Sequence, residues 1–229
     1  MSIPITGISS MATRQVLAEL ADAYARATGC ALRFESVGGV DAARRVRAGE
    51  PFDLVVLARD AIDELIAAGL AVAGSRVDLV HSDVAIAVRA GARRPDIGSE
   101  AALRQAVLAA RSVGYSTGPS GSALLRLFER WGIGGAVRGR LVQAPAGVPV
   151  GQLVAQGEVE LGFQQRSELL HLPGIALLGA MPPGAGIRTT FSAARCSASA
   201  QPAAVDALLQ YLCSPAAADA KRRHGMEPA

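Results

Sequence analysis

The sequence predicts an α/β protein built on parallel sheets. Stretches with the apolar period of a strand alternate with stretches of helical period along the 229 residues. The segment 53–58, Asp-Leu-Val-Val-Leu-Ala, is almost entirely apolar, which is typical of a strand buried on both faces of a parallel sheet. Half of the residues are apolar, so the chain can form a large core. Strands that alternate with helices in this way indicate βαβ units.

The first part of the chain has three such units. Its predicted strands are residues 3–8, 31–36 and 53–58. Each is followed by a helix whose apolar residues share one face: Val16, Leu20 and Tyr24, then Ala43 and Val46, then Ile62, Leu65 and Ile66. Each helix is expected to stop at a glycine, namely Gly29, Gly49 and Gly69.

The rest of the chain repeats the alternation. The predicted strands are residues 84–88, 113–116, 159–163 and 187–194. Helices are expected over residues 99–109, 121–131, 150–155, 202–212 and 215–223. Ser99 is placed to cap its helix, and Pro202 and Pro215 suit first-turn positions. No linker rich in Pro, Gly or Ser interrupts the chain, which favours two lobes joined by strands.

Composition and charge exclude several classes of function. The net charge is +3, and the arginines are mixed with acids, so no clustered basic stripe predicts nucleic-acid binding. Three cysteines without regular spacing predict neither disulfides nor zinc, and we read them as small buried residues in reducing surroundings. Three widely spaced histidines predict no metal site, and no cofactor is expected.

The targeting signals favour a soluble protein without membrane insertion. No apolar run is long enough to span a bilayer. The first residues lack the basic and apolar regions of a signal peptide, so a cytoplasmic location is expected for the chain as written. A periplasmic location is expected instead if a leader has been removed.

Three turns share one design, in which a strand ends, small or polar residues follow, and a helix begins. They contain Ser9 and Ser10, then Gly38 and Gly39, then Ser116, Thr117, Ser120, Gly121 and Ser122. The first N–H groups of a helix have no intrahelical partner, and the helix dipole favours negative charge there. The turns therefore predict an anion site, although N-capping alone also accounts for individual serines. Gly147 and Val148, before a short helix, would add donors. The chain has no nucleotide-binding P-loop, nucleophile elbow or zinc-binding helix motif.

Four stretches resemble the periplasmic molybdate-binding-like family of substrate-binding proteins. They are the serine turn at residues 7–10, the span 38–58, the turn and helix at 113–125, and the Gly-Glu-containing strand at 157–164. The resemblance implies a type II periplasmic-binding-protein fold, with two α/β lobes, central sheets and a cleft between them that holds a small anion. Lobe I would be residues 1–82 plus 190–229, and lobe II residues 83–189. A monomer is the default for this scaffold.

The chain departs from the molybdate binders at two places. Glycines, Gly38 and Gly39, stand where they use serine hydroxyls, and Gln164 stands near the position of their late tyrosine. The turn at 116–121 and the stretch 162–168 resemble the aconitate-isomerase-like branch of the family more closely.

Three functions stay open from the sequence. The first is a solute-binding protein for an oxyanion or polycarboxylate, with an ABC transporter permease as partner if the protein is exported. The second is an isomerase of an unsaturated polycarboxylate, which needs a base and cationic or N–H clamps. Its candidate bases are His81, Glu168 and Tyr115, and its candidate clamps are Arg14, Arg59 and Arg166. The third is a cytoplasmic ligand sensor.

Overall fold

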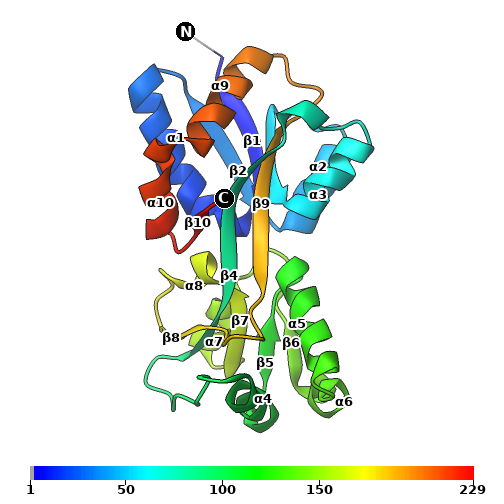
Figure 1. Ribbon diagram of the computed structural model, residues 1–229, viewed down its shortest axis with the longest axis vertical. Helices are drawn as coiled ribbons and strands as arrows, with labels where there is room; N and C mark the ends of the chain where they lie inside the picture. The colour runs from blue at the N-terminus through cyan, green and yellow to red at the C-terminus, as the bar shows by residue number, and fades with distance from the viewer. Residues whose placement is uncertain (1–2) are drawn as a thin grey trace. The chain divides into compact units, whose positions relative to one another are not determined.

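The computed structural model describes residues 3–229 and divides into two compact units (Figure 1). Unit 1 comprises Met1–Ser82 and Thr189–Ala229, and unit 2 comprises Asp83–Arg188. The chain passes from one unit to the other within two strands, β4 (Val77–Arg89) and β9 (Arg188–Arg195). Each unit has its own sheet and its own core.

The sheet of unit 1 combines parallel and antiparallel strands. Its parallel strands are β1 (Ile5–Ser10), β2 (Leu32–Val37) and β3 (Leu54–Ala58), in the order β2-β1-β3. β9 follows β3 antiparallel, then β4, and the short β10 (Glu227–Pro228) pairs antiparallel with β4. The carboxyl ends of β1, β2 and β3 therefore lie at one edge, where loops lead into helices.

Helices cover both faces of this sheet (Figure 1). One face packs against α1 (Arg14–Thr28), α9 (Pro202–Cys213) and α10 (Ala218–Arg223). The other face packs against α2 (Gly39–Arg47) and α3 (Arg59–Ala67). Short 3-10 turns, η1 (Met11–Thr13), η2 (Ala73–Ser75) and η4 (Pro215–Ala217), complete the unit. All five β3 residues are buried, as their apolar run predicts.

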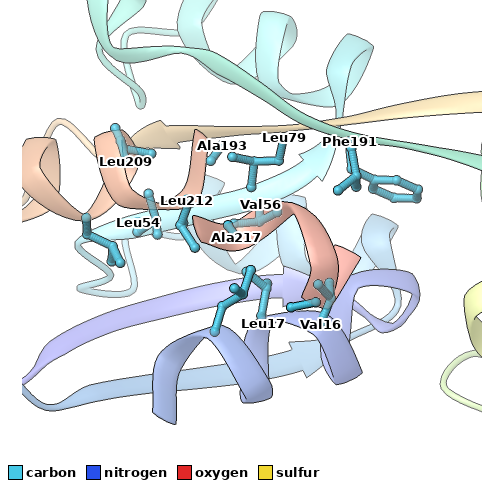
Figure 2. Packing of buried hydrophobic residues seen from close by; sticks show 14 of the residues in the cluster. Val16, Leu17, Leu54, Val56, Leu79, Phe191, Ala193, Leu209, Leu212 and Ala217 are labelled. Carbon is cyan, nitrogen blue, oxygen red and sulfur yellow. The ribbon is translucent and has the colours of Figure 1, made fainter. Parts of the chain in front are cut away.

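Figure 2 shows how the first face is filled. Leu17 of α1 lies opposite Leu54 and Val56 of β3, with Leu212 of α9 and Ala217 beside them. Each of these side chains is almost completely buried. Burial of a leucine-sized side chain contributes roughly 1.5–3 kcal/mol, so this layer fixes β3 and the strand ends that follow it.

Unit 2 is organised in the same way. Its parallel strands are β5 (Val113–Tyr115), β6 (Leu141–Gln143) and β7 (Leu161–Gln165), and β4 pairs antiparallel with β7 and with β8 (Ile175–Ala180). One face carries α4 (Glu100–Ala109), α5 (Pro119–Arg130) and α6 (Gly134–Val137), with η3 (Arg138–Arg140) after them. The other face carries α7 (Val150–Gln156) and α8 (Arg166–Leu169).

Glycines let α7 lie directly on the sheet of unit 2. A Cβ atom on Gly162 of β7 would come within 2.5 Å of the Val154 side chain, and one on Gly114 of β5 within 2.9 Å of Val150. Distances below 3.0 Å do not occur for real Cβ atoms. The two strands therefore need glycine at these positions for the helix to pack closely.

Most predicted elements are confirmed, and the differences have physical reasons. Ser99 caps α4 by accepting a hydrogen bond from the Ala102 N–H at 3.1 Å. The strand predicted at 84–88 was too short, because β4 already begins at Val77, where polar residues hide the strand pattern. The strands β6, β8 and β10 were missed. Two of these are very short, and β8 is only half-buried along most of its length.

Candidate functional site

Two serines mark the carboxyl ends of β1 and β2. Ser9 lies opposite Ser36 in the parallel register, and their Oγ atoms are 2.8 Å apart. Ligands of open α/β sheets bind at the carboxyl ends of the strands. The Ser9 hydroxyl is completely buried and already has a partner, so its role in the unliganded structure is to tie β1 to β2.

Ser10, the last residue of β1, is different. Its side chain is only 7% exposed, and its Oγ has no hydrogen-bond partner among residues 3–229. A Cβ built on Gly39 would lie 3.8 Å from the Ser10 Cβ, so the start of α2 lies next to this hydroxyl. A buried hydroxyl without a partner costs about 1–3 kcal/mol, and such a group in a native structure requires an explanation.

The start of α2 supplies further unpaired donors. The first intrahelical bond runs from the Ala42 N–H to the Gly38 carbonyl at 2.9 Å, so the N–H groups before Ala42 have no partner within the helix. Gly38 is the N-cap, and no side chain caps this helix end. We call Ser10, Gly38 and Gly39, with the N–H groups of the first turn of α2, the Ser10 cradle. Together they present several donors, an arrangement that suits an anion. Asp41 is an acidic residue of the same turn, and its carboxylate accepts a hydrogen bond from Arg44 at 3.3 Å.

An ion pair occupies the next strand end. Arg59 begins α3, and its Nε donates to Asp78 Oδ1 of β4 at 3.2 Å, with a second guanidinium contact to the same carboxylate. Ser192 of β9 also donates to Asp78, at 2.7 Å. The guanidinium of Arg59, predicted as a ligand clamp, is therefore engaged within the protein in this structure.

His81 lies on β4 at the same edge of unit 1. Its Nδ1 is 3.0 Å from the Thr190 Oγ1 of β9, and this is the one hydrogen bond of the ring among the described residues. In the β3–β9 register Ala58 faces Phe191, so Thr190 lies just past the carboxyl end of β3. Three strand spacings separate β1 from β4, which is about 14 Å. The imidazole is thus on the same sheet edge as the Ser10 cradle.

Arg14 is the first basic residue after Ser10 in the chain. It is the first residue of α1, after the turn that follows Ser10, and it is exposed. Its guanidinium has no hydrogen bond or ion pair within residues 3–229, unlike that of Arg59. Of the three predicted clamps, Arg14 is the unpaired one in unit 1, and Arg166 is exposed at the start of α8 in unit 2.

The 116–122 turn of unit 2 has a compact geometry of its own. Ser116 Oγ and the 6%-exposed Ser120 Oγ are 3.2 Å apart, and the N–H groups of Gly121 and Ser122 both donate to the Gly118 carbonyl. A Cβ on Gly121 would lie 1.9 Å from the Ser116 carbonyl oxygen, so only glycine fits there. Thr117 is exposed beside them. The turn therefore has a defined geometry, in which the Ser116 and Ser120 hydroxyls are within hydrogen-bond distance of each other.

The remaining predicted residues of unit 2 form a second group around α7 and α8. The Val148 N–H donates to Pro145, and Gly147 is exposed with a left-handed φ of 77°. Gln164 accepts from the Gly151 N–H at 3.3 Å and donates to Glu168 at 2.6 Å. These bonds link β7 to both helices. Tyr115, at the end of β5, is half-buried, and its carbonyl accepts from Ala144.

Neither the cysteines nor clustered ligands indicate other chemistry. Cys196 is buried, and burial raises the pKa of its thiol to about 12, so it is not a thiolate near neutral pH. The expectation of buried cysteines is wrong for Cys213, which is exposed, and Cys30 is only half-buried. No group of three or more His, Cys, Asp or Glu residues within 3–229 is placed to hold a metal ion. Among the described helices, none has both the length and the apolar character needed to cross a bilayer.

Comparison with known families identifies the scaffold. The family model described as bacterial extracellular solute-binding protein matches residues 5–227. The chain belongs to this family. A curated relative of this chain, aconitate isomerase from a Pseudomonas species, is 41% identical over 230 residues, which cover 98% of this chain and 87% of the relative.

Solved structures support the same fold for this solute-binding protein. The periplasmic molybdate-binding protein of Azotobacter vinelandii matches with a TM-score of 0.80 and 19% identity, over 97% of this chain and 98% of that one. A sulfate-binding protein of Mycobacterium tuberculosis matches with a TM-score of 0.81 and 16% identity, over 100% of this chain and 88% of that one. The type II periplasmic-binding-protein-like fold class is therefore confirmed.

Sequence reasoning missed three polar residues of this solute-binding protein at the edge of unit 1. They are Asp78, Thr190 and Ser192, each bonded to a residue far away in the chain. One signal was present for two of them. Thr190 and Ser192 alternate with apolar Phe191 and Ala193 in a predicted strand, so they share one face of it.

Proposed function

We propose that this solute-binding protein holds a small anion at the Ser10 cradle. The observation that carries the proposal is the Ser10 hydroxyl, which is buried, without a partner, and next to an uncapped helix start. An anion with two or more acceptor oxygens would satisfy both kinds of donor. Its negative charge would also be favoured by the dipole of α2.

We further propose that the anion is an unsaturated polycarboxylate and that the protein isomerises it. The support is the 41% identity to aconitate isomerase over nearly the whole chain. Such a reaction moves a proton from one end carbon of a three-carbon allylic unit to the other, and the double bond moves in the opposite sense. A base removes the proton next to a carboxylate, the double bond shifts, and the proton returns to the other carbon. Donors on the carboxylate stabilise the charge that develops in between.

In this proposal three residues of unit 1 have a role. The Ser10 hydroxyl, with the α2 N–H groups, would hold one carboxylate. The unpaired guanidinium of Arg14 would attract a second carboxylate, a task for which its planar fork is suited. His81 would be the base, because Nε2 lacks a partner and the ring is held by Thr190. The Glu168 carboxylate already accepts a hydrogen bond from Gln164. Glu168 and Tyr115 stay predictions for unit 2.

A binding protein without turnover is the second candidate, favoured by the family match over residues 5–227. It would hold an oxyanion or a carboxylate, and an exported form would deliver it to a transporter. Neutral donors alone suffice for a tetrahedral oxyanion, because oriented dipoles can replace its hydration shell. The two candidates share the Ser10 cradle and differ in whether His81 has a chemical task.

One experiment tests both steps on the full chain. Thermal unfolding is measured with cis- and trans-aconitate, citrate, molybdate and sulfate, and each aconitate isomer is followed for conversion by proton NMR. A ligand at 100 times its dissociation constant stabilises the fold by about 2.7 kcal/mol, which is easily measured. Ser10→Ala should weaken that stabilisation. Ser197→Ala should leave that stabilisation unchanged. Ser197 is exposed and follows Cys196, and the Cys196 N–H donates to the Asp53 carbonyl at the end of β3 away from the Ser10 cradle.

The outcomes separate the candidates. Conversion of one aconitate isomer into the other supports the isomerase, and its loss in His81→Asn supports the assigned base. Stabilisation by molybdate or sulfate with no effect of any carboxylate contradicts the isomerase and leaves the binding protein. An equal response of Ser10→Ala and the native chain to every anion would show that the cradle is not the site.

A further inference from the structure

The partner of the His81 ring comes from a distant part of the chain. His81 is on β4 and Thr190 on β9, 109 residues apart in sequence, and these strands are neighbours in the sheet of unit 1. The Nδ1–Oγ1 distance of 3.0 Å is that of a formed hydrogen bond. Both side chains are half-buried, so the contact is partly shielded from water.

Charged neighbours do not compete for this ring. The Asp78 carboxylate, three residues before His81 on the same strand, is taken up by Arg59 and Ser192. On the other side of β4, Glu227 of β10 lies directly opposite His81 in the antiparallel register, so the two side chains share one face, and no ion pair joins them within residues 3–229. The hydrogen bond of the imidazole within residues 3–229 is therefore with a neutral hydroxyl.

We propose that Thr190 is a positioning residue that holds the His81 ring in the orientation needed for proton transfer at Nε2. This inference rests on the proposed function, in which His81 is the base. It adds a residue that neither the family match nor the turn pattern indicates. The Thr190 hydroxyl can accept from a protonated Nδ1 or donate to an unprotonated one, so the bond holds the ring in place in either tautomer.

The chemistry of a proton shift requires this arrangement. Before transfer, Nε2 must have a free lone pair, so the proton of the neutral ring is on Nδ1 and is donated to Thr190 Oγ1. As the C–H bond of the substrate breaks, the N–H bond at Nε2 forms, and both ring nitrogens are donors. When the proton returns to the second carbon, the neutral ring is restored. Thr190 accepts from Nδ1 in every state, so nothing has to reorganise during the reaction.

Two variants of Thr190 test the inference. Thr190→Val keeps the shape of the side chain and removes the hydroxyl, whereas Thr190→Ser keeps the hydroxyl. We expect Thr190→Val to lower kcat by about 100-fold with little change in KM, because loss of orientation at a catalytic group costs on that order. Thr190→Ser should recover most of the lost kcat. Thermal unfolding of both variants shows that they fold.

A spectroscopic readout makes the test independent of activity. The ring nitrogens of uniformly ¹⁵N-labelled protein are observed by long-range ¹H–¹⁵N correlation, and His81 is assigned by the loss of its signals in His81→Asn. The native chain and Thr190→Ser should have similar His81 ring-nitrogen shifts, and Thr190→Val should shift the Nδ1 signal because its hydrogen bond is lost. Unchanged ring-nitrogen shifts in Thr190→Val overturn the inference at any level of activity. Absence of turnover in the native chain overturns the proposed isomerase instead, and the ring-nitrogen shifts still decide the role of Thr190.

Discussion

Replacing Ser10 by alanine should stabilise the unliganded protein and weaken its ligand binding at the same time. The hydroxyl is 7% exposed and has no hydrogen-bond partner, so the folded state has desolvated a polar group without compensation. That desolvation costs about 1–3 kcal/mol. The alanine side chain removes the cost and leaves a gap of one oxygen atom. We expect a net gain of about 1 kcal/mol, which is about 2–4 °C in Tm for a chain of this size.

The effect on binding has the opposite sign. A hydrogen bond to a charged partner contributes about 1.5–3 kcal/mol, so Ser10→Ala should weaken anion binding by about 10- to 100-fold. At an anion concentration 100 times the native Kd, ligand stabilisation should fall from about 2.7 kcal/mol to about 1.4 kcal/mol or less. The unliganded variant would thus unfold at a higher temperature than the native chain, and its ligand-induced shift would be smaller.

Differential scanning calorimetry with and without the anion measures both effects, and the neighbouring serine is the matched control. Ser9→Ala breaks the 2.8 Å bond to Ser36, so it should lower the free energy of unfolding by about 1 kcal/mol. The reasoning is refuted if Ser10→Ala destabilises the unliganded protein as much as Ser9→Ala does. It is also refuted if the affinity for every tested anion is unchanged.

Two buried charged groups give further predictions. Asp53→Ala should lower the free energy of unfolding by about 3 kcal/mol in chemical denaturation, because Thr6, Ser199 and Gln201 all donate to this carboxylate. Burial alone would raise the pKa of Asp53, but these bonds outweigh it and hold the pKa below the ordinary 3.8. The stability it confers is therefore present above that pH and is lost as the pH falls through the folded-state pKa, and a deficit independent of pH would contradict this. Burial lowers the pKa of Lys221, which is 3% exposed, below 10.5. Lys221→Met should thus stabilise the fold by on the order of 1 kcal/mol at neutral pH, and the gain should shrink as the pH approaches 10.5. A variant less stable than the native chain at neutral pH would disprove it.

The sequence could predict the elements whose signal is local. A strand end followed by small residues and an amphipathic helix is written in consecutive residues, so the turns at Ser10, Gly39 and Ser120 could be located before the structure was known. The parallel arrangement then places the first two at one sheet edge. Their hydrogen bonds could not be predicted in the same way. Ser9 has a partner and Ser10 has none, although both are serines of one turn, because adjacent residues of a strand point to opposite faces.

Contacts between residues far apart in the chain could not be predicted from the sequence, for a different reason. The pairing of Arg59 with Asp78, and of His81 with Thr190, depends on the order β3-β9-β4 in the sheet. That order brings a strand from near the end of the chain between two strands of its first part. The spacing of residues within one segment does not predict this strand order. An arginine predicted as a ligand clamp therefore proved to be engaged with an aspartate that no pattern had singled out.

The distribution of satisfied and unsatisfied groups at the edge of unit 1 separates structural residues from binding residues. Where a polar group already has a partner within the protein, as in Arg59, a ligand would have to break that contact before gaining one. Within residues 3–229, Ser10, Arg14 and the Nε2 atom of His81 have no side-chain hydrogen bond or ion pair to lose. A simple oxyanion does not need all three of these groups, the hydroxyl, the guanidinium and the imidazole nitrogen at one sheet edge. A polycarboxylate that undergoes proton transfer has a use for each of them, which is why we propose the isomerase before the binding protein.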